Sequence, residues 1–155
     1  YINSVCKEIE AQKVVDYCQN ETANLILTAY AQRFEKSGIS CEIKFVLGRD
    51  IRISSVDMCI ILANAQKNAL NECKFLMTQN ISTEISVNGY EKDNRIFIQI
   101  SNPCRKNVLF NDGMPVTKAE GHGVGTKSIC SVVNKYNGMC SFKTKGDIFI
   151  LRVVI

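Results

Sequence analysis

Residues 55–77 carry a long helical pattern of apolar side chains, and this pattern constrains the fold more than any other feature of the chain. An α-helix turns about 100° per residue, which gathers these side chains on one face. Ser54 or Ser55 can cap the helix, and Asp57 in its first turn suits the positive end of the helix dipole. The apolar face needs a second layer to pack against, and it consists of Met58, Ile61, Ala65, Ala69, Cys73 and Leu76.

Three asparagines lie along the edge of this apolar face, although asparagine is a mediocre helix former. Asn64, Asn68 and Asn71 fall close to one line, while Lys67 and Lys74 lie further out toward solvent. The amides therefore form a polar seam where a bound ligand could meet the helix. Amide oxygens are neutral hard ligands that suit Mg²⁺. The alternative is that the asparagines are ordinary surface residues or cap neighbouring loops.

The remaining patterns predict a single α+β domain. It is a two-layer α/β sandwich in which helices cover one face of a mixed sheet of about five strands. The last strand is apolar on both faces, which places it in the sheet centre. Helical periods cover 2–18, 21–37 and 123–136, and Gly38 ends the second of them. Strand patterns cover 41–47, 82–90, 95–101, 139–145 and 148–155. Residues 103–120 have no clear period.

Composition excludes several classes of protein for this segment. The net charge is only +4 and the basic residues are scattered, so no nucleic-acid partner is expected. The eight cysteines include no Cys-x-x-Cys pair and several lie in apolar patterns, which favours free thiols in a reducing cytoplasm and no zinc site. No apolar run reaches the length of about 20 residues that spans a membrane. The chain begins at Tyr1 rather than Met, so we expect a piece of a longer protein.

A glycine-rich turn, "EGHGVGTKSI" at 120–129, precedes the last helix. Gly121, Gly123 and Gly125 allow the backbone to approach a phosphate, and the helix start offers unpaired N–H groups. Lys127 and Ser128 add donors within the first turn. The turn follows a long loop rather than a first strand, so the Rossmann dinucleotide-binding pattern fits poorly, and the Walker spacing of phosphate-binding loops is absent. The alternative is a plain helix start with a flexible hinge.

Together the two stretches resemble the ATP-binding catalytic domain of sensor histidine kinases, within the Bergerat-fold superfamily that includes gyrase-type ATPases and heat-shock chaperones. "ISSVDMCIILANAQKNALNEC" resembles the asparagine box, and "GHGVGTKSICSVVNKYNG" the glycine box, of the peptide-sensing, quorum-type kinases of Gram-positive bacteria. The resemblance covers nearly the whole chain. It implies ATP and Mg²⁺ as cofactors, a catalytic domain over 19–155, and an N-terminal helix over 1–18 that ends a dimerisation stalk.

The resemblance also assigns roles to individual residues. Asn68 matches the Mg²⁺ ligand, and Asn64 takes the catalytic position where many histidine kinases carry a general-base glutamate. Residues 103–120 match the mobile ATP lid, in which Arg105, Lys106 or Lys118 could contact phosphates. The other residues expected to bind the nucleotide are Asn71, Asn102, Lys118, Gly121, His122, Gly123, Val124, Gly125, Thr126 and Lys127.

The sequence departs from the family pattern near the expected adenine site. Asn102 replaces an aspartate, and its amide could accept from the adenine amino group and donate to the ring. Ile148 stands where many relatives carry a threonine near the adenine. Further departures are Lys67 for an acidic residue, Asn71-Glu72 for Glu-Ala, and Thr126 for a leucine.

The expected activity is phosphoryl transfer from Mg-ATP to a histidine on another domain. The expected partners are the histidine-bearing dimerisation domain of the same protein and a response regulator, in a membrane-bound homodimer whose cytoplasmic part contains this domain. The only histidine, His122, lies in the glycine box, so this chain carries no acceptor. Two alternatives are a nucleotide-dead interaction or dimerisation module of the same fold, and a protein-serine kinase or ATPase of the same superfamily.

Overall fold

The computed structural model of the chain describes residues 15–116 and 123–155. None of the helices in these ranges is both long enough and apolar enough to cross a membrane. The elements follow in the order α2 (Glu21–Lys36), β1 (Ser40–Val46), α3 (Ser55–Thr78), β2 (Glu84–Lys92), β3 (Arg95–Pro103), β4 (Phe110–Asn111), β5 (Met114–Pro115), α4 (Val124–Lys135), β6 (Met139–Lys145) and β7 (Ile148–Val154).

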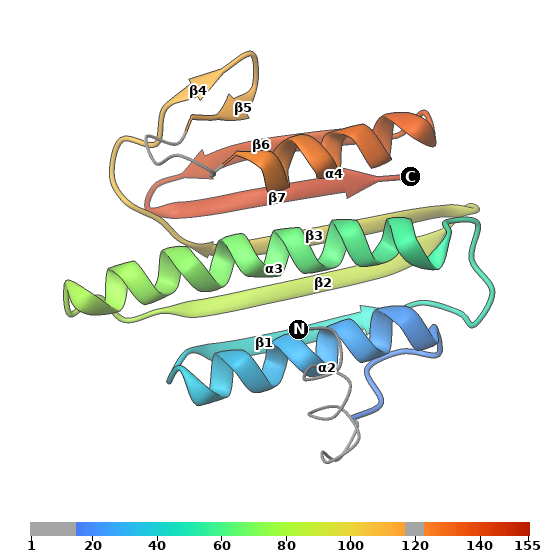
Figure 1. Cartoon of the computed structure of the whole chain (residues 1–155), viewed down its shortest axis with the longest axis horizontal. Coiled ribbons are helices and arrows are strands. Elements are labelled where there is room, and N and C mark those ends of the chain that lie inside the picture. Colours follow the sequence, from blue (N-terminus) through green and yellow to red (C-terminus); the bar gives the residue numbers. More distant parts are fainter. Residues whose placement is uncertain (1–14, 117–122) are drawn as a thin grey trace.

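A mixed five-stranded sheet forms one layer, with the strand order β1-β2-β3-β7-β6. β1 pairs in parallel with β2, and the other neighbours pair antiparallel. α2, α3 and α4 lie side by side on one face of this sheet, with α3 in the middle (Figure 1). The predicted two-layer sandwich is therefore confirmed. β7 has a neighbour on each side, as its apolar pattern requires, but β3 rather than β7 holds the central place.

The long helical pattern becomes α3, and its predicted apolar face forms much of the core. All six apolar residues predicted to face inward are buried, none with more than 4% of its surface exposed. Ser54 is the N-cap, and its hydroxyl oxygen accepts from the backbone N–H of Asp57. The opposing layer consists of the inward-facing strand residues Ile85, Val87, Ile96, Ile98, Ile100, Leu151 and Val153.

The structure differs from the sequence prediction in two segments. Residues 15–18, the described end of the predicted helix over 2–18, are not helical. Here the amide oxygen of Asn24 accepts from the backbone N–H groups of Tyr17 and Cys18, which holds the chain across α2. The second difference lies within 103–120, where β4 and β5 form a small hairpin that the lack of periodicity did not predict.

A polar cluster ties the start of α3 to the end of α4. Lys135 Nζ and the Tyr136 hydroxyl both donate to Asp57 Oδ2, the first over 2.7 Å. The Tyr136 oxygen in turn accepts from the backbone N–H of Ser54. The hydrogen bonds from Lys135, Tyr136 and Ser54 stabilise the carboxylate and lower the pKa of Asp57 from 3.8 to about 2.

We expect this cluster to make stability depend on pH in the acid range. Because the pKa of Asp57 is lower in the folded chain than its ordinary 3.8, its contribution is complete above that value and is lost as the pH falls toward about 2. Urea unfolding at about pH 6 and about pH 3 should show a smaller acid-induced loss in Asp57→Asn than in the wild type. Lys135→Met should reduce the loss as well, and equal losses in all three proteins would contradict the prediction.

Candidate functional site

The asparagine seam of α3 meets the first turn of α4. A side-chain Cβ placed on Gly125 would lie 3.1 Å from Asn64 Oδ1, so a larger residue at 125 would require the Asn64 side chain to shift by a few tenths of an ångström. Asn64 Nδ2 donates to the carbonyl of Ile60 over 2.8 Å. This bond turns the amide oxygen of half-buried Asn64 toward Gly125. The structure thus brings together two residues that lie 61 positions apart in the sequence.

The first turn of α4 presents its backbone amides without a side-chain cap. Gly123 is the N-cap, with a φ of 100° that favours glycine, and no described side chain accepts from the N–H groups of the helix start. The first turn itself holds no acidic residue. The buried Thr126 hydroxyl donates to the Gly123 carbonyl, and the Ser128 hydroxyl donates to Val124. Ser128, expected as a ligand donor, therefore points back onto its own helix.

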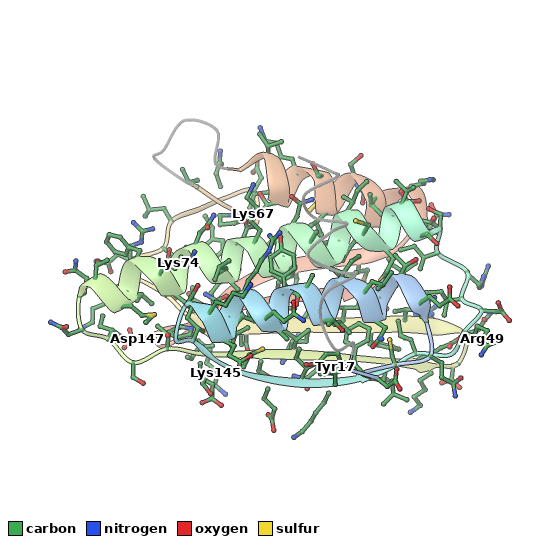
Figure 2. All side chains as sticks on the ribbon, turned by 60° about the horizontal axis from the view of Figure 1, so that its bottom comes forward. Tyr17, Arg49, Lys67, Lys74, Lys145 and Asp147 are labelled. Atoms are coloured by element: carbon green, nitrogen blue, oxygen red, sulfur yellow. The ribbon has the colours of Figure 1, made fainter. Side chains whose placement is uncertain are left out.

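The remaining polar residues of the α3 seam face outward. Asn68 lies one turn after Asn64 and is exposed, as is Asn71. Lys67 and Lys74 are exposed as well, on the side of α3 away from the sheet (Figure 2). Among the three asparagines of the seam, only Asn64 is half-buried, while Asn68 and Asn71 are exposed as the two lysines are.

Asn102 is buried near the end of β3, with 5% of its surface exposed. Its Nδ2 donates to the carbonyl of Pro103 over 2.8 Å, which commits one amide hydrogen within the protein. The register pairs Asn102 with Phe149 and Pro103 with Ile148. Paired residues share a face and neighbours alternate, so Phe149 is on the face of Asn102 and Ile148 on the opposite one. The register therefore sets Phe149, rather than Ile148, beside the buried Asn102.

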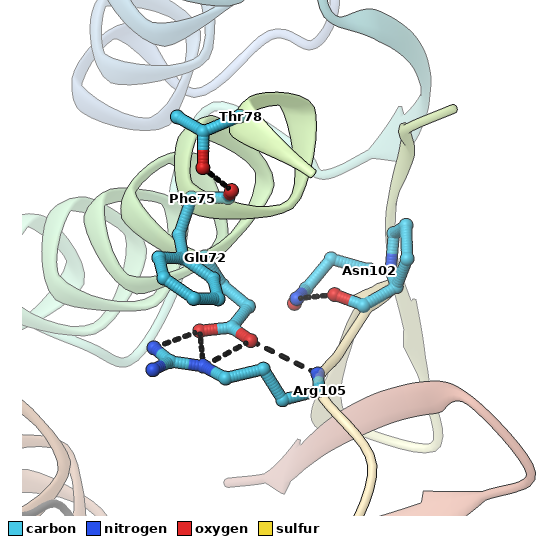
Figure 3. Close-up of polar contacts among 6 residues, drawn as sticks. Glu72, Phe75, Thr78, Asn102 and Arg105 are labelled. Carbon is cyan, nitrogen blue, oxygen red and sulfur yellow. Dashed lines mark hydrogen bonds and ion pairs between the residues drawn. The ribbon is translucent and has the colours of Figure 1, made fainter. Parts of the chain in front are cut away.

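Arg105 clamps the chain that leaves β3 onto α3 (Figure 3). Its Nη2 and Nε donate to Glu72 at 2.8 and 3.0 Å, and its backbone N–H donates to the same carboxylate over 3.0 Å. The guanidinium also lies over the Phe75 ring, 4.1 Å from the centroid. The pair explains why Glu72 replaces a small residue near the apolar face. Arg105, one of the basic residues expected to contact phosphates, is engaged with Glu72.

The other expected ligands divide between described and undescribed parts of the chain. Val124 and Lys127 are exposed on the first turn of α4. Lys118, Gly121 and His122 lie outside the described residues. Sequence reasoning missed Phe149 and the Glu72–Arg105 pair, since both depend on contacts between distant parts of the chain. The only sequence signal was an acidic residue beside an apolar face.

These features define a class of site: amides on one helix opposite the uncapped, glycine-rich start of another. The family model for the GHKL domain matches residues 53–155, which include both helices. The chain belongs to the GHKL domain family. A comparison with curated proteins finds no significant match.

Solved structures of histidine kinases share the fold at low sequence identity. The catalytic domain of histidine kinase ThkA superposes with a TM-score of 0.65 at 11% identity, covering 87% of this chain and 90% of that one. The histidine kinase AdeS of Acinetobacter baumannii gives 0.62 at 10% identity, with 99% and 74% covered. Full-length ShkA in complex with AMPPNP gives 0.60 at 11% identity, with 86% and 28% covered. The fold is thus that of histidine kinase catalytic domains, which confirms the predicted Bergerat-type class.

Proposed function

We propose that this domain binds Mg-ATP between α3 and the start of α4 and presents the γ-phosphate to a histidine on another domain of the same protein. The single observation that carries the proposal is the contact between Asn64 and Gly125. This approach supports the proposal because it sets the amide of Asn64 beside the first turn of α4, whose N–H groups no side chain caps within the described residues. A polyphosphate needs such donors, and a hydrated metal needs neutral oxygen ligands.

The donor set fits this cofactor. The N–H groups in the first turn of α4 donate to phosphate oxygens, and Lys127 adds a positive charge nearby. Asn68 supplies one amide oxygen to Mg²⁺, which neutralises phosphate charge when it is bound. Asn64 orients a water or the acceptor by hydrogen bonding, because an amide cannot take up a proton as a general base. Asn71 is the third amide of the same seam.

Asn102 reads the adenine in this proposal. With Nδ2 bonded to the Pro103 carbonyl, the amide oxygen accepts from the exocyclic amino group of the base. A neutral acceptor holds this donor more weakly than the aspartate of the family pattern. Phe149 provides an apolar surface beside it. The undescribed residues Lys118, Gly121 and His122 complete the phosphate site, and the Glu72–Arg105 pair fixes the start of the lid.

The wider context follows from the resemblance to sensor kinases. The domain belongs in the cytoplasmic part of a membrane-bound homodimeric sensor of the peptide-sensing, quorum-type group. Its partners are the histidine-bearing dimerisation domain and a response regulator. Because His122 is the chain's only histidine, the domain alone forms no phosphohistidine from labelled ATP and does so once the dimerisation domain is added. Acid-labile label on the isolated domain contradicts this assignment.

Calorimetry with a non-hydrolysable ATP analogue tests the central claim. We expect a saturable heat whose affinity Mg²⁺ increases and which the matching GTP analogue does not produce, since guanine has no amino group for Asn102 at that position. No heat at millimolar nucleotide favours the nucleotide-dead module of the same fold. Binding with transfer of phosphate to serine favours the protein-serine kinase instead.

The Asn68→Ala variant should lose the part of the affinity that depends on Mg²⁺. Removing one neutral ligand should weaken binding by about tenfold in the presence of Mg²⁺, and little in EDTA. Asn134→Ala removes an exposed asparagine of α4 and serves as the matched control. Equal effects with and without Mg²⁺ would show that Asn68 does not contact the metal.

A further inference from the structure

The face of the sheet opposite the helices carries a row of apolar side chains, one from each strand. The register pairs Val46 with Tyr90, Tyr90 with Phe97, Phe97 with Val154, and Val154 with Met139. The exposed fractions are 73% for Val46, 69% for Met139 and 49% for Tyr90. The rings of Tyr90 and Phe97 stack with centroids 4.9 Å apart. We name these five residues the outer row; within the described residues, no helix covers them (Figures 1 and 2).

The outer row is one residue wide and has polar, mainly basic flanks. At the hairpin that joins β2 and β3, Lys92 and Arg95 are paired and exposed beside it. On its other side the next register row is polar and consists of Lys44, Asn88, Gln99, Arg152 and Ser141. The exposed charges on this face are basic at Lys44, Lys92, Arg95, Lys143, Lys145 and Arg152, against acidic Glu42 and Glu84.

We infer that the outer row is a docking site for an acidic amphipathic helix of a partner protein. Five strands at their usual spacing give a row of roughly 19 Å, which a helix of about 13 residues spans. Such a helix carries one apolar stripe, which matches a row one residue wide. Glutamate or aspartate on both sides of that stripe would face the basic side chains that flank the row.

Three other occupants fit the same surface less well. A second copy of this face would bring the basic flanks of both copies against each other. A lipid bilayer would have to bury the polar row beside Lys44, and polar groups without hydrogen-bond partners are costly in hydrocarbon. The chain's own residues 1–14 carry equal numbers of acidic and basic residues, so they do not complement a basic face.

A designed peptide tests the inference directly. The probe is a helical peptide of about 15 residues with leucine at every third or fourth position and glutamate on both sides of that stripe. Fluorescence anisotropy measures its binding to the wild-type domain, and amide shifts in a ¹⁵N spectrum map the contact. We expect binding that weakens in about 0.5 M salt, with shifts on the strands near the outer row. A peptide with lysine in place of glutamate should not bind.

Variants separate this surface from general stickiness. Val46→Lys and Met139→Lys should each weaken binding by about tenfold or more, and both sites are exposed enough for the change to leave folding intact. Lys92→Glu should weaken binding by a similar factor. Val56→Lys is the matched control, because Val56 on α3 is 69% exposed, as Met139 is, and lies on the helical layer.

Several results would overturn the inference. They are failure of the acidic peptide to bind, equal binding to the Val46→Lys and Val56→Lys variants, and preference for the lysine peptide. Binding of anionic vesicles that Val46→Lys abolishes would assign the surface to membranes, and dimerisation that it abolishes would assign it to a second copy. The nucleotide site lies on the helical layer, so Val46→Lys should keep the wild-type calorimetric response to nucleotide, whatever the peptide does.

Discussion

The Gly89→Ala variant should lose about 3 kcal/mol of its free energy of unfolding, because the core has no room for one more methyl group there. A Cβ on Gly89 would lie 2.3 Å from the ring of Phe45, its register partner on β1. Phe45 is buried, with 3% of its surface exposed, so the ring cannot move into solvent. Urea unfolding of the variant and the wild type measures the loss.

A smaller partner should rescue this variant. Phe45→Leu leaves space over residue 89, so the double variant should be more stable than the sum of the single changes predicts, by about 1 kcal/mol or more. Gly48→Ala is the control, since a Cβ there meets only Glu91 Oε2 at 3.9 Å and the backbone is not left-handed. Additive losses in the double variant would mean that Phe45 is not what excludes the methyl group.

Periodic burial explains why so much of this fold could be predicted from the sequence. The apolar positions of α3 recur with the helical period, so Met58 and Leu76 could be assigned to one face without knowing what covers it. Ser54 and Gly38 mark helix ends through local chemistry, a side-chain cap and a left-handed backbone. Such signals need no information from distant parts of the chain.

Pairing between distant segments explains what could not be predicted. A shift of one residue moves a strand side chain to the other face, and this separates Ile148 from its buried-side neighbour Phe149. Arg105 and Glu72 are joined across 33 positions, and nothing local to either residue indicates the other. The same holds for Lys135 and Asp57. The candidate site was therefore predicted as two motifs, while their contact at Asn64 and Gly125 came from the structure.

The Gly125→Val variant should bind the ATP analogue with Mg²⁺ about thirtyfold more weakly or worse, yet remain folded. A Cβ alone would lie 3.1 Å from Asn64 Oδ1, so the two methyl groups of valine would press on the Asn64 side chain. In the proposed site they would also stand where phosphate reaches the first-turn amides of α4. Helix propensity should not destabilise α4 in this variant, because valine is a better helix former than glycine.

Comparing binding with stability makes this prediction decisive for the proposed function. Calorimetry should show the loss of affinity while the thermal midpoint changes little, and Gly125→Ala should give a smaller loss in the same direction. Ser131→Val places the same side chain on an exposed part of α4 and should leave nucleotide binding unchanged. If Gly125→Val instead unfolds the domain, the comparison of nucleotide affinity with stability is made on Gly125→Ala. Wild-type affinity in folded Gly125→Val would place the nucleotide away from Asn64 and Gly125, and the assignment of both residues would fail.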